Sequence, residues 1–221
     1  MIVQQSTTAT TQAPQLCAVT LLGNLVSTPD IRYRANPVCA ITEITLATHS
    51  KWLDKNTNQY KEWTSYHHIK VEGELVEQAL LQAQKGDIIL VHGHLSKLKT
   101  NQTEHHDIVH ANFIQRFAKG YTQSINQIHC SAKLTSQPKL MLTEHGKQLC
   151  QADIVIHQHN YSHEKQCWQN SLIERSIHVW GKLAQYLAEH GQANQELMVE
   201  GKLSYASNKS QYIDVNKLHL F

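Results

Sequence analysis

The sequence predicts an all-β protein built from two similar barrels in tandem, with one short helix in each barrel. The chain of 221 residues has room for two small domains, and 41% hydrophobic residues are enough to fill their cores. Short runs of β-branched and apolar residues recur between Gly, Pro, Asn and Asp, which is typical of strands. A set of short motifs also occurs twice in one order, which indicates a duplicated domain.

The repeat consists of three pairs of matching segments. NLVSTPDI at 24–31 matches KLTSQPKL at 133–140, IKVEGELV at 69–76 matches IHVWGKLA at 177–184, and LVHGHL at 90–95 matches MVEGKL at 198–203. The partners are separated by 109, 108 and 108 residues. This period is too long for a solenoid, whereas duplication of one small domain explains it directly.

Each copy is expected to contain five strands and one helix. In the first copy the strands are expected at 16–26, 38–47, 63–71, 87–95 and 108–117. A helix is expected over 74–84, because apolar residues recur there at helical spacing and Gly86 follows as a stop signal. The second copy repeats this helix before Gly191. Five strands with a helix between the third and the fourth is the order of an OB-fold barrel.

The chain is therefore expected to divide into four parts. Residues 1–15 are rich in Thr and Gln and are expected to be a disordered extension. The first OB-fold domain is expected at 16–118, a polar linker at 119–126, and a diverged second OB-fold domain at 127–221.

The composition excludes several classes of protein. The formal net charge of +2 is too mild to indicate nucleic-acid binding by itself, and it argues against binding of duplex DNA through a broad basic face. The five Cys contain no CxxC pair, no signal-peptide pattern is present, and no apolar run approaches the ~20 residues of a transmembrane helix. We expect a soluble cytoplasmic protein with reduced thiols and no membrane association.

A family resemblance is carried by four segments of the first half: LLGNLVSTPDIRYR at 21–34, ITLATHSKWLDK at 44–55, KEWTSYHHIKVEGEL at 61–75 and QKGDIILVHGHLSKLK at 84–99. They resemble the bacterial single-stranded-DNA-binding protein family, and the second half joins through the internal repeat. The resemblance implies non-catalytic binding and protection of single-stranded DNA in replication, recombination or repair. It also implies a homodimer with four OB folds, associated with the bacterial nucleoid.

Two aromatic residues of the first half are candidates for stacking on DNA bases. A sequence-tolerant binder stacks aromatic side chains on exposed bases and follows the phosphates with Lys and Arg. Trp52 lies in a polar segment between Lys51 and Lys55. By the resemblance, Trp52 falls on a stacking tryptophan of the family and Tyr66 on a second stacking position. Alternatively, Trp52 anchors a hairpin to its barrel, and Tyr66 packs at the core or an edge.

Two other stacking positions of the family are replaced in the first half, by Glu72 and by Thr100. The Glu72 carboxylate should repel phosphates and weaken binding there. The second half restores one position, because Trp180 stands where the first half has Glu72, but it has no clear equivalents of Trp52 and Tyr66. Its other candidate aromatics are Tyr161 and Trp168. We hypothesise that stacking residues are divided between the barrels and that linkage raises affinity through effective concentration.

Basic residues cluster at the expected hairpins of the first half. They are Arg32, Arg34, Lys51, Lys55, Lys61, Lys97 and Lys99. Each by itself is explained as a solvated surface charge, but together they form a plausible path for phosphates.

The sequence gives little support for a metal site or an enzyme. HQHNYSHEKQC contains His157, His159, His163 and Cys167, but a structural zinc site usually takes its ligands from two chain segments. His105, His106 and His110 are weaker candidates still. No nucleophile motif or phosphate-cradling Gly loop occurs, so no catalytic residue and no cofactor are expected.

One alternative function remains open. An OB-fold adaptor that contacts primosome or recombination proteins would explain the replacement of stacking aromatics at Glu72 and Thr100, whereas Trp52 with its Lys neighbours favours DNA. The family's acidic C-terminal tail, which recruits replication and repair enzymes, has no counterpart after KLHLF at 217–221. We therefore expect a specialised or mobile-element version of the family.

Overall fold

The computed structural model describes residues 14–54, 57–99, 105–120, 123–162, 167–208 and 210–221. The first barrel contains β1 (Cys17–Leu25), β2 (Arg32–Ala35), β3 (Val38–Asp54), β4 (Gln59–Glu72), α1 (Glu74–Ala79), β5 (Ile88–Lys99) and β6 (His105–Phe117). The second contains β7 (Ile125–Leu134), β8 (Lys139–Leu142), β9 (Gln148–Ser162), β10 (Cys167–Trp180), α2 (Gly181–His190), β11 (Glu196–Tyr205) and β12 (Gln211–Leu220). Residues 1–13 of the expected extension lie outside the described residues.

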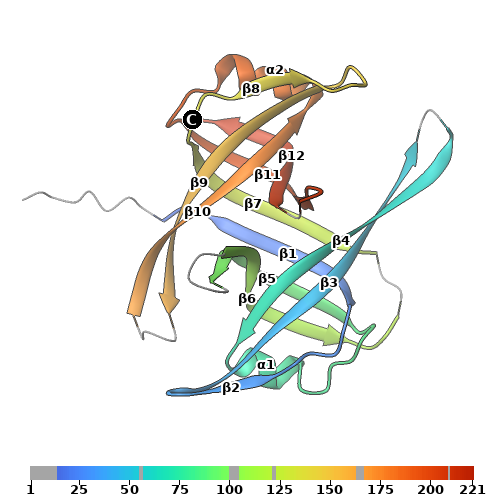
Figure 1. Ribbon diagram of the computed structural model, residues 1–221, viewed down its shortest axis with the longest axis vertical. Coiled ribbons are helices and arrows are strands. Elements are labelled where there is room, and N and C mark those ends of the chain that lie inside the picture. The colour runs from blue at the N-terminus through green and yellow to red at the C-terminus, as the bar shows by residue number, and fades with distance from the viewer. Residues whose placement is uncertain (1–13, 55–56, 100–104, 121–122, 163–166, 209) are drawn as a thin grey trace, which may run out of the picture.

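The structure confirms two tandem OB-fold barrels, each with five long strands and a helix between the third and the fourth (Figure 1). Each barrel also has one short strand that the sequence analysis missed, β2 or β8, which pairs with the long strand that follows it. These strands have four residues each, too few for alternation to be recognised.

The first helix is shorter than expected, because α1 ends at Ala79 rather than near residue 84. The amide of Ala83 donates to the Leu80 carbonyl at 3.1 Å, as in a turn, and the Asp87 side chain accepts from the Gln84 amide at 2.9 Å. Leu80 and Ala83 are nevertheless buried. Their helical spacing thus reflects burial in a compact turn rather than a continuing helix.

The central hairpin of the first barrel is longer than the sequence predicts. β3 continues to Asp54 and β4 begins at Gln59, well beyond the expected ranges 38–47 and 63–71. Beyond Thr48 the side chains of β3 are exposed or partly exposed on both faces. Pairing of backbone groups, and not an apolar pattern, holds this part together, so hydrophobic periodicity does not reveal it.

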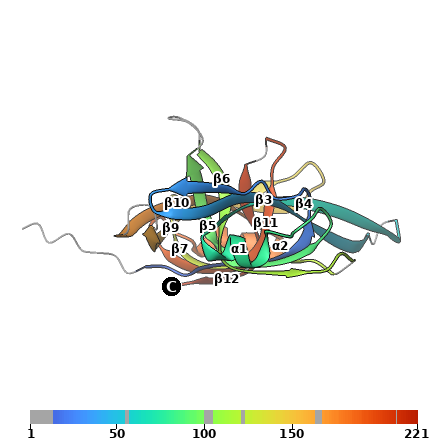
Figure 2. The ribbon, with the colours of Figure 1, turned by 90° about the horizontal axis from the view of Figure 1, so that it is seen from below.

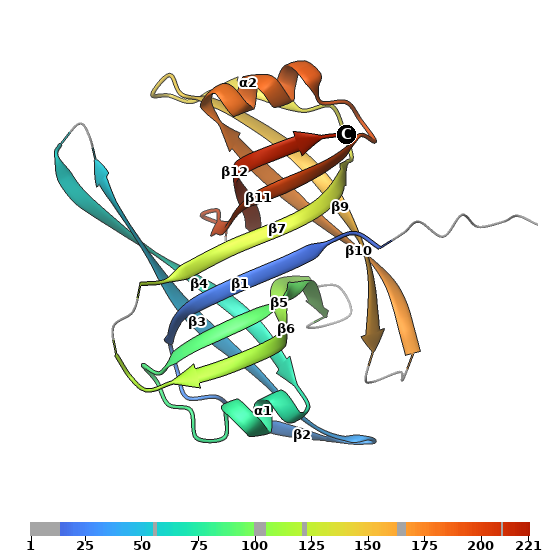
Figure 3. The same ribbon diagram turned by 180° about the vertical axis from the view of Figure 1, so that it is seen from behind.

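All strands form one continuous sheet, in the order β2-β3-β4-β6-β5-β1-β7-β11-β12-β10-β9-β8. The two barrels are joined where β1 and β7 pair in antiparallel fashion, from Cys17 opposite Cys130 to Leu22 opposite Ile125 (Figure 3). Each barrel closes through an additional pairing, β1 with β3 and β7 with β9.

An approximate two-fold axis relates the barrels and passes through this junction. Val19 of β1 pairs with Gly93, and Ile128 of β7 pairs with Gly201, while Val19 and Ile128 pair with each other. Both glycines lie at a β-bulge. A Cβ atom at Gly93 would lie 2.0 Å from the His110 carbonyl oxygen, so only glycine fits the close approach of the strands there.

The long hairpins, β3–β4 and β9–β10, extend from the barrels on opposite sides of the molecule (Figures 1 and 2). Each also touches the other barrel. His67 Nδ1 of β4 lies 3.1 Å from the Tyr205 hydroxyl of β11, and Gln158 Nε2 of β9 donates to the Leu95 carbonyl at 3.0 Å. Among the described residues, no helix is long and apolar enough to cross a membrane.

Candidate nucleic-acid interface

The β3–β4 hairpin carries a group of exposed aromatic side chains. Trp52 lies opposite Lys61, and Tyr66 lies opposite Ala47, in one uninterrupted register. Because successive side chains of a strand point to opposite faces, this register places Trp52 and Tyr66 on different faces of the hairpin. Trp52 is 46% exposed and Tyr66 is 53% exposed, so neither side chain is buried in the core.

Two further aromatics on this hairpin were missed by the sequence analysis. Trp63 lies opposite Ser50 and therefore shares a face with Trp52, and Tyr60 shares the face of Tyr66. Trp63 is 63% exposed and Tyr60 is 68% exposed. Extending the strand alternation of β4 toward its polar start would have placed Tyr60 on the exposed face, but Trp63 on the face of the buried His67 and Ile69, so this signal could have found Tyr60 only.

Cations accompany these aromatics on the hairpin. Lys51 Nζ lies 3.1 Å from Glu62 and 5.1 Å from the centre of the Tyr60 ring. Lys61, opposite Trp52, forms an ion pair with Asp54. The hairpin thus alternates large aromatic rings with positive charges, each balanced by a nearby carboxylate.

Glu72, at the end of β4, lies among positive groups. Its carboxylate is 2.8 Å from Lys70, 3.8 Å from Arg34 and 3.6 Å from His110. Partial burial would raise the pKa of Glu72, but the hydrogen bond and charge of Lys70, followed by His110 and Arg34, hold this pKa below its usual value. The charge expected to repel phosphates at Glu72 is therefore compensated locally.

The remaining predicted cations are spread over the first barrel. Arg32 forms an exposed ion pair with Asp30 at 2.7 Å, and Lys97 of β5 lies 3.6 Å from Glu174 of β10. Lys99 is the last residue of β5, and its side chain is outside the described part of the chain. Lys55 and Thr100 also lie outside the described residues.

The second hairpin carries a different set of aromatics. Gly73, directly before α1, and Gly181, the first residue of α2, both have positive φ, and Trp180 stands before Gly181 as Glu72 stands before Gly73. Trp180 is partly exposed. The same 108-residue offset, with the registers of both hairpins, places Asn160 at the position of Trp52 and Glu174 at that of Tyr66.

The His and Cys run proposed as a zinc candidate serves other contacts. His159 Nδ1 donates to Asn170 Oδ1 at 2.7 Å, and its ring stacks on Trp168 with centroids 4.9 Å apart. His163 lies outside the described residues. Within the described part of the chain, three or more His, Cys, Asp or Glu side chains do not come together as a metal site.

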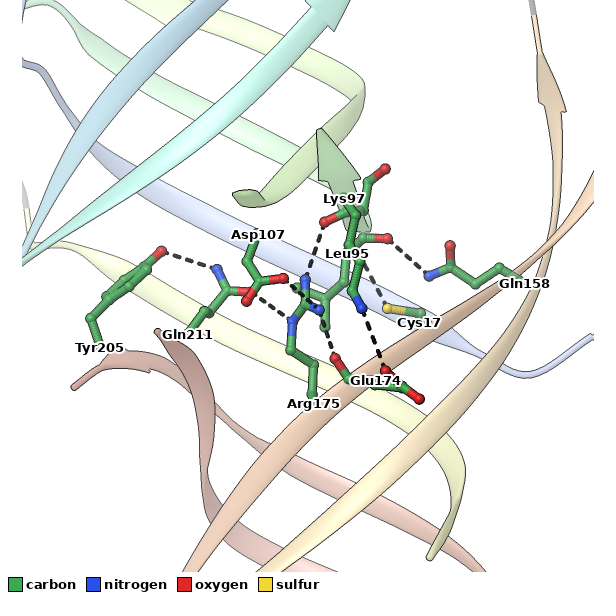
Figure 4. Close-up of polar contacts among 10 residues, drawn as sticks. Cys17, Leu95, Lys97, Asp107, Gln158, Glu174, Arg175, Tyr205 and Gln211 are labelled. Carbon is green, nitrogen blue, oxygen red and sulfur yellow. Dashed lines mark hydrogen bonds and ion pairs between the residues drawn. The ribbon is translucent and has the colours of Figure 1, made fainter. Parts of the chain in front are cut away.

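A buried polar network crosses the junction of the barrels beside this interface (Figure 4). Arg175 of β10 is 3.1 Å from the Ser96 carbonyl and 2.8 Å from Asp107, both in the first barrel, and it donates to Gln211 Oε1 at 3.1 Å. Gln211 Nε2 in turn donates to the Tyr205 hydroxyl at 3.1 Å. The network ties the base of the second hairpin to the first barrel.

The network continues into the first barrel through His67. Tyr205 Oη lies 3.1 Å from His67 Nδ1, and His67 Nε2 lies 2.8 Å from Thr48 Oγ1. If the Tyr205 hydroxyl donates to His67 Nδ1 and His67 Nε2 donates to the Thr48 hydroxyl, every group in this series of hydrogen bonds has a partner. Burial raises the pKa of Tyr205 to about 12, and burial, with the nearby His68, lowers the pKa of His67 to about 4. Both groups are therefore neutral at physiological pH.

Comparison with known proteins agrees with this architecture. The chain matches the Single-strand binding protein family over residues 16–116 and 125–218. The wild-type single-stranded DNA binding protein from Thermus aquaticus is 23% identical, with 95% of this chain and 94% of that chain covered and a TM-score of 0.77. A deletion mutant of the same protein is 24% identical, with coverages of 95% and 96% and a TM-score of 0.78.

A shorter solved structure is similar to part of the chain. It is the Plasmodium falciparum SSB in complex with single-stranded DNA, which is 27% identical, covers 48% of this chain and 96% of its own, and has a TM-score of 0.40. The family match spans both barrels and most of the sequence. This chain therefore belongs to the single-strand binding protein family.

Proposed function

We propose that this protein binds and protects single-stranded DNA without catalysing a reaction and largely independently of sequence. The observation that carries the proposal is the exposed aromatic and cationic surface of the β3–β4 hairpin, in a chain of this family. Aromatic side chains stack on any base, at about 1–3 kcal/mol per base, and cations attract the phosphates. Such contacts read neither base edges nor a duplex groove.

The proposed contacts follow the hairpin and its surroundings. Stacking is assigned to Trp52, Tyr66 and Trp180, with Trp63 and Tyr60 as additional platforms. Phosphate contacts are assigned to Arg32, Arg34, Lys51, Lys55, Lys61, Lys97 and Lys99. Because Trp52 and Tyr66 lie on opposite faces, a strand that contacts both must pass around the hairpin rather than along one side of it.

Neither the structure nor the family match favours the adaptor alternative. It rested on Glu72 and Thr100 as replaced stacking positions. The charge of Glu72 is compensated by Lys70 and Arg34, and Thr100 lies outside the described residues. The family match favours DNA as the ligand.

The biological setting of this activity is also a proposal. We infer a homodimer, in which two chains would bring together four OB folds, acting in replication, recombination or repair in the bacterial cytoplasm. The resemblance to the family supports this inference, because it implies four OB folds in one unit; Phe113, which is 46% exposed, is the candidate contact with a second copy.

The proposed function is tested by titration with oligo-dT, followed by tryptophan fluorescence at two salt concentrations. Stacking on Trp52, Trp63 or Trp180 should quench the fluorescence to saturation, and added salt should weaken binding because phosphate contacts release counterions. A folded protein that shows no quenching and no change in the anisotropy of labelled DNA at low salt would refute DNA binding.

A further inference from the structure

A cleft of about 820 Å³ lies where the end of the β9–β10 hairpin meets the first barrel. The first barrel contributes the start of β3, the junction of β4 and α1, and parts of β5 and β6. The second barrel contributes Asn160, Tyr161 and Trp168. Tyr161 and Trp168 were named from the sequence only as candidate aromatics without an assigned position, and none of the residues to which stacking or phosphate contacts are assigned above lines the cleft. Its volume is in the range that holds a ligand of nucleotide size.

The second barrel presents a rigid aromatic platform to this cleft. The Trp168 indole is nearly parallel to the His159 ring, with an angle of 4° between the planes, and Tyr161 meets Trp168 edge-on at 5.7 Å. His159 is itself held by Asn170 at 2.7 Å. Trp168 is nevertheless 62% exposed. The indole is thus fixed in orientation before a ligand arrives, which reduces the entropy lost on stacking.

The first barrel lines the same cleft with a second pair of stacked rings. His94 and His110 have centroids 5.2 Å apart and planes inclined by 24°. Burial, together with the neighbouring His110, lowers the pKa of His94 to about 4, so the His94 ring is neutral at physiological pH. Flat ring pairs from two barrels around one cleft suit a flat ligand better than an extended peptide.

The charges around the cleft indicate which part of a DNA strand would enter it. Glu74 and Glu77 line it beside Glu72, whose charge is compensated, and none of its described lining residues is Lys or Arg. Carboxylates disfavour phosphates, whereas carboxylate and amide groups can accept or donate hydrogen bonds at base edges. The cations nearest the lining are Arg34 and Lys70, which contact Glu72. A base in the cleft would thus leave its phosphate beside these two side chains.

We propose that the cleft is a further DNA subsite, in which an unpaired base stacks on Trp168 and the strand crosses from the first barrel to the second hairpin. This inference rests on the proposed function, since it takes single-stranded DNA as the ligand. It explains how the second hairpin takes part in binding although Asn160 and Glu174 occupy the positions of Trp52 and Tyr66.

The test compares Trp168→Ala, Trp168→Phe and Tyr186→Ala in the full chain. Tyr186 is a matched control, because it is an exposed aromatic that stacks on His190 of α2 and does not line the cleft. Affinity for labelled oligo-dT is measured by anisotropy, with thermal unfolding as the check of folding. Loss of one stacked base should weaken binding roughly 5- to 150-fold in Trp168→Ala. Trp168→Phe should recover most of the affinity, and Tyr186→Ala should bind like the unaltered protein.

A second readout detects the contact itself. Oligonucleotides containing 5-iodouracil are cross-linked to the unaltered protein by light, and the cross-linked peptides are identified by mass spectrometry. The proposal expects the peptide that contains Trp168 among them. The proposal is refuted if Trp168→Ala binds DNA as tightly as Tyr186→Ala and no such peptide is found, while Trp52→Ala loses affinity. The protein would then bind DNA elsewhere, and the cleft would not be a DNA site. If the unaltered protein does not bind DNA at all, the proposed function fails as well.

Discussion

His67 of β4 and Arg175 of β10 occupy equivalent positions of the two barrels, and each reaches across the junction to the other barrel. His67 lies opposite Leu46, and Arg175 lies opposite Ile154, 108 residues later in both strands. His67 contacts Tyr205 of the second barrel, and Arg175 contacts Asp107 of the first. The duplicated position has thus kept one task, joining the barrels, with two different side chains.

Removing Arg175 should destabilise the protein strongly. Its side chain is 1% exposed, and Arg175→Ala leaves the partly buried Asp107 carboxylate without its cation and the buried Gln211 Oε1 without its donor. Loss of one member of a buried ion pair costs about 3–5 kcal/mol of unfolding free energy. Chemical denaturation measures this loss. The control is Arg32→Ala, whose ion pair with Asp30 is exposed and should contribute little. Equal midpoints for the two variants would contradict a structural role for Arg175.

Stability should decrease as the pH falls from about 6.5 to about 4. The folded-state pKa of His67 is about 4, while an unfolded histidine titrates near 6.5, so in this window the unfolded state binds a proton that the folded state does not. The loss amounts to about 3 kcal/mol for this one site at the low end of the window. Burial also lowers the pKa of His94, so His94 likewise contributes stability that is lost as the pH falls.

The contribution of His67 can be isolated by comparing pH profiles. Denaturation midpoints of the unaltered protein and of His67→Gln are measured between pH 7 and pH 4.5. Glutamine does not titrate, so the variant should start less stable but lose less stability on acidification. Parallel profiles would show that His67 takes up its proton equally in the folded and unfolded states.

Gly201 should be intolerant of any side chain. A Cβ atom there would lie 2.3 Å from the Asp214 carbonyl oxygen, which belongs to the backbone of the paired strand and cannot move aside cheaply. Gly201→Ala should lower the free energy of unfolding by about 3 kcal/mol. Gly120→Ala is the control, because its nearest contact would be Ile88 Cδ1 at 3.6 Å. Thermal unfolding of Gly201→Ala and Gly120→Ala measures the difference. Similar melting temperatures for the two variants would argue against a close approach of the strands at Gly201.

Trp52 and Tyr66 should contribute to DNA affinity independently. They lie on opposite faces of the β3–β4 hairpin, so each would stack on a different base. Trp52→Ala and Tyr66→Ala should each weaken binding of oligo-dT by about 1–3 kcal/mol, and the double variant should show nearly the sum. Anisotropy titrations at one salt concentration measure this. A double variant no weaker than one single variant would mean that both rings serve the same base.

The proposed homodimer predicts a solution mass of twice the 25.2 kDa chain. Light scattering at micromolar concentration measures it. Phe113→Glu, on the outer face of the sheet, should shift the mass toward one chain, because a carboxylate is costly in an apolar interface. A single-chain mass for the unaltered protein would contradict the dimer.

The internal repeat, the strand order and the helix position could all be predicted from the sequence. These features are local, since alternation, turn residues and a glycine stop depend on neighbours along the chain. The hairpin ends were missed for the same reason: from Thr48 to Glu62 the strands are polar, and only their mutual pairing makes them strands. Tyr60 was missed with them, whereas Trp63 opened an expected strand but was not recognised as an exposed aromatic.

Only the tertiary structure decided how the two barrels and their sites combine. Pairing of β1 with β7 joins residues more than a hundred positions apart, and no local pattern specifies which strand edges will meet. The junction of the barrels forms the cleft that Glu72 and Trp168 both line. It also brings Arg175 of the second barrel to Asp107 of the first. The sequence determined what each barrel is, whereas long-range packing determined what lies between them, because contacts between distant segments depend on the whole fold.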